Sequence, residues 1–577
     1  MESKIPEIST CNNNHLLPAT PTYTNCFCFF CIISETEPNL RKSGIYHYFK
    51  QMPLKDDQEH VLVLSALWKI AMTKPNDPEF PSLGIFRCMA KLIQKGVSDK
   101  AWLLRHQNIY IPYYAAHIIG SYAMNKPKFT QKALNSKVLQ PLLELLQGKI
   151  SWVERRVAIR ALGHLTSHEA TFEAITEHEV EIIEAAINIA SSCIDEVYRE
   201  FLGLKEFERL DYHKNLITRG IGGLELENRK AEEWASELQC WSLYLVDRFV
   251  RRRKRCLRLI CKKKQFLKDL CGMWGGLMSP SSPAGVGVLR TLCRTRIGRE
   301  TIADLHQVVD CICNVSRSSD YRQYMAIESL VELVRDPVTR YRVIDAAAPV
   351  LADLVELKSI RGRLKHRVGQ EIMQALLHDY HKIKFCRSSF GSERTKKILE
   401  ELWNSKVDRV RKEKLMNEEE IREKEELSNV LKNEANKKFR LGEIENSLMN
   451  YSKALGLCPL KLAKERIVLY SNRAQCYLLL ENAEAAISDT TRALCLSSTV
   501  NCTHSKSLWR RSQAYDMKGL AKESLMDCLM FVSNRFGLRR CRRKKGFKII
   551  PYYAARMINK QMNSTWIFAP AKSKTHG

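Results

Sequence analysis

The sequence predicts an all-α fold class with an elongated, repeating architecture, and three observations support it. A chain of 577 residues, 45% hydrophobic and 27% charged, is too long for a single core yet ordinary in composition for a folded protein. Only 25 Gly and 18 Pro are present, which favours helices joined by short turns over many strands. From about residue 60 onward, apolar residues recur at helical spacing in one segment after another. We therefore expect an α-solenoid of stacked helices that complete each other's cores.

Composition shifts divide the chain into four expected parts. Residues 1–45 lack a sustained period and are rich in Asn, Thr and Pro, which indicates a loose N-terminal arm. Residues 46–384 form the helical solenoid, interrupted by a Pro/Ser/Gly loop from Ser279 to Gly287. Residues 385–427 are dense in Glu, Lys and Arg with opposite charges at helical spacing, which predicts a charged helical linker. Residues 428–577 form the last domain, which ends in a capping helix.

Two patches of the solenoid resemble armadillo repeats. In the first, an apolar helix around Val138 to Leu146 is followed by a polar break and then by Ala and Leu at helical spacing up to Leu165. In the second, an apolar run begins at Val308, and two further runs reach Leu357. The armadillo family stacks two or three helices per repeat of roughly 40–47 residues. The resemblance implies an armadillo-like solenoid, with degenerate copies between the two patches.

The region after residue 428 resembles the tetratricopeptide repeat (TPR) family, whose unit of about 34 residues is a pair of antiparallel helices with small residues where they cross. Three motifs carry the resemblance: Ala435, Phe439, Gly442, Tyr451, Ala454 and Pro459; Ala474, Tyr477, Ala486 and Ala493; and Ser512, Ala514, Tyr515 and Gly519. The sequence departs from the family pattern at Ser447 and Ser524, where Ala is usual, and at Glu481, where Gly is usual. The resemblance implies a three-motif TPR domain with a concave groove lined by the first helix of each pair.

One TPR subclass, found in co-chaperones, carries a carboxylate clamp in this groove. Its pattern falls residue by residue on Lys432, Asn436, Asn472, Lys506 and Arg510, and all five residue types match. Lys432 and Asn436 are one helical turn apart, as are Lys506 and Arg510, so each pair shares a helix face. The resemblance implies that these donors bind the acidic C-terminal tail of a heat-shock chaperone, because a terminal Asp presents two carboxylates close together. The alternative is that the two Asn satisfy backbone groups and the cations are solvated surface.

The whole arrangement resembles plant ARM-repeat/TPR-like proteins and, in reversed order, the myosin-folding co-chaperones that join a TPR clamp to an armadillo-type region. This resemblance implies a protein–protein interaction adaptor, a co-chaperone whose solenoid holds a second, unidentified client protein. The expected compartment is the cytoplasm, with the nucleus left open.

The charge balance supports a second hypothesis. Lys and Arg exceed Asp and Glu by 92 to 64, a formal charge of +28, and basic runs occur at 251–264 and 539–545. Such an excess favours acidic partners, so a nucleic-acid-binding or nuclear scaffold protein with a generic TPR surface is the alternative. Within the first run Leu257, Ile260 and Leu267 keep an apolar helical stripe, which favours the solvated face of a solenoid helix.

The sequence offers no catalytic candidate. It contains no H-E-x-x-H, G-x-S-x-G, P-loop or kinase motif, so we expect a non-enzymatic chain without cofactor or metal. Cys28 and Cys31 form a single C-x-x-C without a second pair, for which apolar burial or a loose arm is the simpler interpretation. The longest early apolar stretch, Cys26 to Ile33, covers less than half of the ~20 residues that span a membrane, so no membrane partner is expected.

Overall fold

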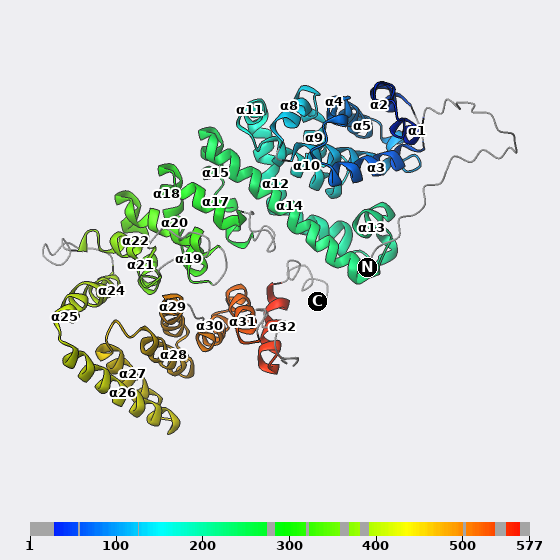
Figure 1. The fold of residues 1–577 in the computed structure, drawn as a ribbon. Helices are drawn as coiled ribbons and strands as arrows, with labels where there is room; N and C mark the ends of the chain where they lie inside the picture. The colour runs from blue at the N-terminus through cyan, green and yellow to red at the C-terminus, as the bar shows by residue number, and fades with distance from the viewer. Residues whose placement is uncertain are drawn as a thin grey trace, which may run out of the picture.

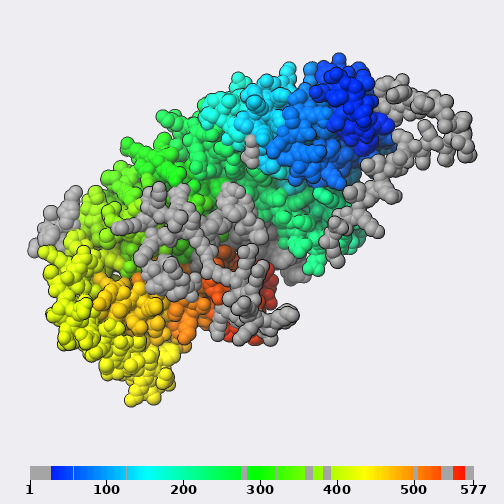
Figure 2. Space-filling model, viewed as in Figure 1, coloured from blue at the N-terminus to red at the C-terminus, as the bar shows by residue number. Residues whose placement is uncertain are grey.

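A computed structural model describes residues 28–55, 58–124, 126–273, 283–318, 322–357, 368–380, 392–499, 504–536 and 550–565. Every secondary-structure element in these residues is helical, which confirms the predicted fold class. The helices stack from α1 to α22 into a curved solenoid, and the chain then turns at α24 and α25 (Figure 1). The remaining helices, α26–α32, run back alongside the second half of the solenoid. The molecule is therefore elongated and doubled back on itself (Figure 2).

The N-terminal segment is not a loose arm throughout. Helices α1 (Phe29–Ile33) and α2 (Pro38–Gln51) lie within or across the expected arm, and the rings of Phe29, Phe49 and Phe80 pack with centroids 5.8–6.5 Å apart. Phe29 is buried against the solenoid even though its surroundings lack a helical period. The prediction was wrong here because aromatic burial, which a short irregular segment can achieve, leaves no periodic signal. Residues 1–27 lie outside the described residues.

The first half of the solenoid stacks helices around one continuous apolar core. Small residues set the closest approaches: a Cβ on Gly120 of α7 would lie 3.3 Å from the Cα of Ala161 on α10. The predicted armadillo-like pair from Val138 to Leu165 corresponds to α9 and α10. The longer helices of this half are α3 (His60–Thr73), α5 (Ile85–Ser98), α7 (Ile111–Ala123), α8 (Pro127–Asn135), α9 (Leu139–Leu146), α10 (Trp152–Leu165), α12 (Glu179–Val197), α13 (Asp211–Thr218) and α14 (Leu224–Arg252).

The second half of the solenoid continues the same core. Its helices are α15 (Lys254–Lys262), α16 (Lys264–Asp269), η6 (Leu270–Gly272), α17 (Ala284–Cys293), α18 (Arg296–Ala303), α19 (His306–Ser316), α20 (Gln323–Arg335), α21 (Pro337–Asp353) and α22 (Val368–Leu377). The second armadillo-like patch corresponds to α19, α20 and α21, with Asp336 capping α21 through its bond from the Val338 amide.

The expected loop from Ser279 to Gly287 ends earlier than predicted. Residues 279–282 lie outside the described residues, but α17 begins at Ala284 and buries both Gly285 and Gly287. A Cβ on Gly285 would lie 1.8 Å from the carbonyl oxygen of Leu270. The glycines therefore permit close backbone packing inside a helix, and their turn-forming composition misled the sequence interpretation.

The charged linker is also more integrated than a solvated helix would be. In α24 (Glu393–Trp403), Leu399 and Leu402 are buried in the solenoid core beside α21. A π-helical turn (Asn404–Asp408) and α25 (Arg409–Leu415) follow. Helix α26 (Glu418–Arg440) starts at a capping box of Asn417 and Glu420 and crosses the expected boundary at 428 without interruption. The high density of charged residues in this region makes its short apolar stripe hard to recognise in the sequence.

The C-terminal domain consists of three antiparallel helix pairs and a last helix. The pairs are α26 with α27 (Ile444–Leu457), α28 (Ala463–Leu479) with α29 (Ala483–Thr499), and α30 (Ser505–Met517) with α31 (Ala521–Phe536); α32 (Tyr552–Thr565) packs on α31. At the third crossing Ser512 and Ser524 each donate to the other's carbonyl, at 2.9 and 2.8 Å. Ser447 donates to the Ala435 carbonyl at 2.9 Å across the first crossing. At Ser447 and Ser524, where the family usually has Ala, the buried serine hydroxyl is therefore hydrogen-bonded.

The domain docks on the solenoid mainly through α29, and Arg466 of α28 adds a bond to Glu356 at 2.9 Å. Asp353, fully buried at the end of α21, accepts from Arg317 Nη2 at 2.7 Å, Arg492 Nε at 2.8 Å and Ser488 Oγ at 2.6 Å. Arg317 also donates to Glu484 on α29 at 2.6 Å. We call this cluster the Asp353 junction. It fixes the domain to the solenoid by buried, charge-assisted hydrogen bonds.

Candidate functional site

The candidate peptide groove is lined by the first helices of the three pairs. Lys432 and Asn436 lie on α26, Asn472 lies on α28, and Lys506 and Arg510 lie on α30. Each of these helices also buries small or apolar residues elsewhere on its circumference, so helical periodicity sets the polar face.

A buried tyrosine joins the two asparagines. The Tyr451 hydroxyl donates to Asn436 Oδ1 at 2.7 Å, and the same side chain hydrogen-bonds Asn472. Burial raises the pKa of Tyr451, so the hydroxyl stays protonated and available as a donor. In the sequence, Tyr451 is recognisable only as a member of the first TPR motif. Its second role has no sequence signal, because it depends on α27 bringing the hydroxyl between α26 and α28.

Arg510 extends this cluster from the third pair. Its Nη1 donates to both the backbone carbonyl and the hydroxyl of Ser471 at 2.6 Å, and its Nε donates to Gln475 Oε1 at 3.0 Å. Burial lowers the pKa of Arg510. Among the described residues, no carboxylate lies within ion-pair distance of this guanidinium. A half-buried cation held only by neutral acceptors has unused capacity for an anion.

Lys506 extends the positive charge of the groove to the start of α30, where it lies close to His504. Lys506 is exposed one turn before Arg510, and His504 bonds Ser507 at 2.8 Å. Burial lowers the pKa of His504, and the charges of Arg510 and Lys506 lower it further. This end of the groove is therefore electropositive at neutral pH with the imidazole uncharged.

Lys432 is engaged differently from the other four residues. Its Nζ bonds Glu465 Oε2 at 2.9 Å and Asn429 Oδ1 at 2.8 Å. The structure thus brings Asn436, Asn472 and Arg510 around Tyr451 and places Lys506 beside Arg510, whereas Lys432 is paired with a carboxylate of α28. Glu465 occupies the position that a ligand carboxylate would take on Lys432.

The groove residues differ from the residues that contact the solenoid, although α28 carries both kinds: its Arg466 donates to Glu356 of the solenoid at 2.9 Å. The partners of Lys432, Asn436 and Arg510 described above all belong to the domain itself, while Glu484, Ser488 and Arg492 of α29 bond to the solenoid. The donors of the groove are ammonium, guanidinium and amide groups, the set that recognises carboxylates.

The first basic run is largely an intramolecular surface. Arg251 pairs with Asp247 at 2.8 Å, Arg252 with Glu169 at 2.9 Å, and Arg253 Nε with Glu179 at 2.8 Å. The apolar stripe Leu257, Ile260 and Leu267 is buried, as expected of the face of a solenoid helix. The second run, 539–545, lies outside the described residues.

Two further observations concern classes of site other than the groove. In the described part of the chain, no helix combines the length and the apolar character that crossing a bilayer requires. The same residues contain no cluster of three or more metal-ligating side chains, and Cys28 serves as the N-cap of α1 through its sulfur, 3.5 Å from the Cys31 amide.

Part of the chain matches a known family of helical repeats. Residues 20–262 match the family model "Plant ARM repeat", and the chain as a whole is a helical repeat protein. Among particular relatives, the chain is 39% identical over 89 residues to protein unc-45 homolog B of Danio rerio, which is 15% of this chain and 9% of that protein. It is 32% identical over 96 residues to the mitochondrial import receptor subunit TOM70 of Rattus norvegicus, 17% of this chain and 15% of that protein. The chain thus matches only a small fraction of either relative. An engineered protein of solved structure aligns over 92% of this chain with 13% identity and a TM-score of 0.38, too low to assign a shared fold.

Proposed function

We propose that this chain is a non-enzymatic cytoplasmic adaptor, a co-chaperone whose groove binds the acidic C-terminal tail of a heat-shock chaperone while the solenoid holds another protein. The observation that carries the proposal is Arg510, a half-buried guanidinium with only neutral acceptors around it. A peptide carboxylate is the ligand that completes its hydrogen bonding. Each charge-assisted hydrogen bond of this kind contributes roughly 1.5–3 kcal/mol.

The remaining groove residues favour a C-terminal carboxylate over a general acidic surface. Asn436 and Asn472 share one tyrosine, so amide donors are held close to the guanidinium rather than spread over the surface. A terminal Asp offers two carboxylates a few ångströms apart, which matches a compact cluster of cations and amides. The similarity to an import receptor subunit and to protein unc-45 homolog B supports a protein-binding role for the repeats.

Docking of the domain supports the adaptor role. The solenoid is held mainly by residues of α29 and by Arg466 of α28, none of which is a groove residue, so both parts are available to separate partners in the same conformation. The solenoid partner is proposed only as a protein, since stacked helices build extended protein-binding surfaces.

The test is calorimetric titration of the full chain with an acidic peptide ending in Glu-Glu-Val-Asp. We expect micromolar binding, about −8 kcal/mol. The same peptide with an amidated C-terminus should not bind, nor should a Lys506→Ala/Arg510→Ala variant. The matched control is Lys453→Ala, which removes an exposed cation of α27 outside the groove and should bind as the wild type does.

Two results would contradict the proposal. The groove would not recognise a terminal carboxylate if the amidated peptide bound equally well, or if binding persisted in the Lys506→Ala/Arg510→Ala variant. Binding of unrelated nucleic acids that falls steeply with salt would instead favour the scaffold hypothesis based on the basic runs.

A further inference from the structure

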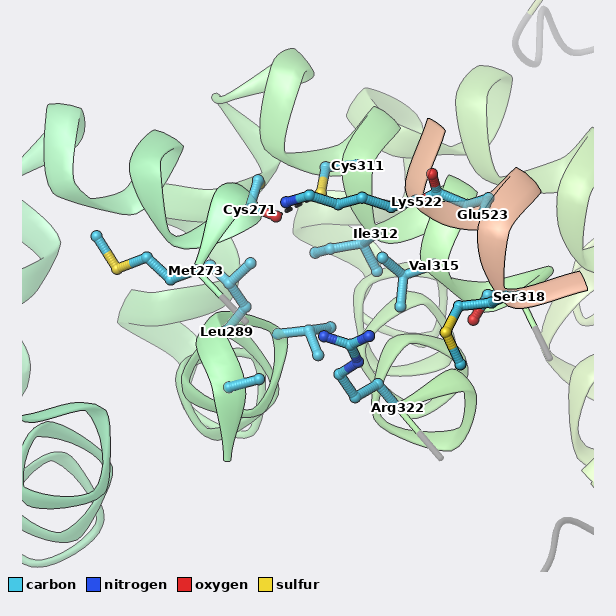
Figure 3. A pocket seen from close by; sticks show the side chains of 13 residues that line it. Cys271, Met273, Leu289, Cys311, Ile312, Val315, Ser318, Arg322, Lys522 and Glu523 are labelled. Carbon is cyan, nitrogen blue, oxygen red and sulfur yellow. Dashed lines mark hydrogen bonds between the residues drawn. The ribbon is translucent and has the colours of Figure 1, made fainter. Parts of the chain in front are cut away.

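A narrow pocket lies where the C-terminal domain meets the solenoid, away from the peptide groove. It is lined from the solenoid by Cys271, Cys311 and Arg322 and from α31 by Lys522 and Glu523 (Figure 3). The space for water-sized molecules is about 50 Å³. A single water needs roughly 10–15 Å³ on this measure, and drug-sized ligands need several hundred. The pocket therefore admits small molecules only.

Two cysteines from different elements meet in this pocket. Cys271 belongs to η6 and Cys311 to α19, and both are half-buried. The Cys311 sulfur lies 3.9 Å from the carbonyl oxygen of Cys271. The interaction between the two thiol side chains lowers the pKa of Cys271, and the same interaction together with burial raises the pKa of Cys311. The two thiols thus lie beside each other, with the lowered pKa at Cys271.

Lys522 places a positive charge at this pair. Its side chain reaches from α31 across the pocket toward Cys271 and Cys311 (Figure 3). Its Nζ donates to the Gly272 carbonyl at 3.1 Å. The ammonium contributes to the lowered pKa of Cys271. Cysteines buried in the apolar core differ, since burial raises the pKa of Cys88, Cys193 and Cys293. Reactive cysteines in proteins are partly exposed thiols in electropositive surroundings, whereas buried apolar ones are inert.

We propose that Cys271 and Cys311 are a peroxide-sensitive dithiol, in which Cys271 is the attacking thiol, Cys311 is the resolving thiol, and Lys522 of the docked domain is the positioning residue. This modification site is independent of the peptide groove. Its reactivity depends on docking, because the lysine and the cysteines come from opposite sides of the interface.

The chemistry balances with a hydroperoxide as the oxidant. The Cys271 thiolate attacks one oxygen of hydrogen peroxide, the O–O bond breaks, and Cys271 becomes a sulfenic acid while hydroxide leaves and is protonated to water. The Cys311 sulfur then attacks the sulfenic sulfur, an S–S bond forms, and the second oxygen leaves as water with the thiol proton. Two thiols and one peroxide thus give one disulfide and two waters, and an added dithiol reverses the step.

The first test maps the product in the intact protein. The full chain is treated with hydrogen peroxide, free thiols are blocked with N-ethylmaleimide, and tryptic peptides are sequenced by mass spectrometry. We expect a reducible link between peptides 269–290 and 300–317, with fragment ions assigning it to Cys311. The second peptide also contains Cys313, whose thiol is buried and bonds the Ala346 carbonyl at 3.6 Å. The control Cys313→Ser should therefore keep the link, and Cys311→Ser should leave Cys271 as a sulfenic acid that a dimedone reagent traps.

The second test concerns Lys522. Lys522→Met should slow alkylation of Cys271 by iodoacetamide by at least about threefold. The thiolate is the reacting form of the cysteine, and removing the ammonium lowers its population. Lys522→Arg should restore the rate, which a merely structural role of the side chain would not require. Lys453→Met, on an exposed face of the same domain, should leave it unchanged.

The outcomes decide the proposal in either direction. A Cys271–Cys311 link that forms at peroxide concentrations leaving exposed Cys31 unmodified supports it. No link, a link through Cys313, or a Cys271 rate insensitive to Lys522→Met overturns it.

Discussion

The Asp353 junction offers a direct test of how the two parts of the chain are held together. Asp353→Asn keeps the shape of the side chain but removes the negative charge that Arg317 and Arg492 share. Arg317 is 5% exposed, so it would be left buried with only one of its two carboxylates. Breaking one partner out of a buried ion pair costs about 3–5 kcal/mol. That is a large part of the stability of a typical domain.

The assay must follow the junction rather than global unfolding, because a chain with several cooperative units need not unfold in two states. Hydrogen exchange of amides in α21 and α29 is the suitable measurement, with expected loss of protection corresponding to about 3–5 kcal/mol. The control is Asp304→Asn, whose exposed pair with Arg342 should contribute at most about 1 kcal/mol.

A double variant separates charge burial from packing. Replacing both members of a buried pair can be nearly neutral, so Arg492→Met in the Asp353→Asn background should cost less than the sum of the single changes. The reasoning would be refuted if Asp353→Asn exchanged like the wild type, or if the two changes were additive. Either result would mean that apolar contacts hold the junction without the ion pairs.

Three further predictions concern single residues. Glu465→Gln removes the internal carboxylate on Lys432 and should tighten acidic-peptide binding up to about fivefold, about 1 kcal/mol, by calorimetry; weaker binding would contradict the competition. Glu481→Gly relieves a left-handed residue with φ 56° and should raise stability by roughly 0.5–1 kcal/mol in thermal unfolding of the domain, whereas a drop would show compensating contacts. Burial opposes ionisation of Glu484, yet its basic partners hold its pKa at about 2, so its contribution is present above pH 4.5 and is lost as the pH falls toward 2. Exchange of junction amides measured against pH should show this loss, on the order of 1 kcal/mol after solvent screening, and Glu484→Gln should flatten it.

The sequence predicts the repeat units better than their contacts with one another. Ala435, Ala474 and Ala514 are fully buried at helix crossings. The spacing of small residues that underlies the TPR resemblance therefore corresponds to close helix packing in the structure. Hydrophobic periodicity does not detect a buried segment that is short and depends on one aromatic side chain, as at Phe29. It also misses a short apolar stripe surrounded by charged residues, as at Leu399.

Contacts over long sequence separations leave no local signal. Asp353 and Arg492 meet because the chain doubles back at α24 and α25, and nothing in either segment encodes that turn. For the candidate site, residue types and helical spacing predict which faces carry Lys432, Asn436, Asn472, Lys506 and Arg510. They do not predict that Tyr451 joins the two asparagines or that Glu465 holds Lys432, because both partners come from neighbouring helices.

The doubled-back chain also has a mechanical consequence. If the proposed peptide were pulled against a protein held by the solenoid, the force would pass along the covalent path through α24 and α25 and, in parallel, through the contacts between domain and solenoid, chief among them the Asp353 junction. The hydrogen bonds of the junction are lost over small displacements, whereas the covalent path can extend only after α24 and α25 are peeled from their neighbours. Under tension the junction would therefore open first, and the two arms would swing apart about the α24–α25 turn before any repeat unfolds.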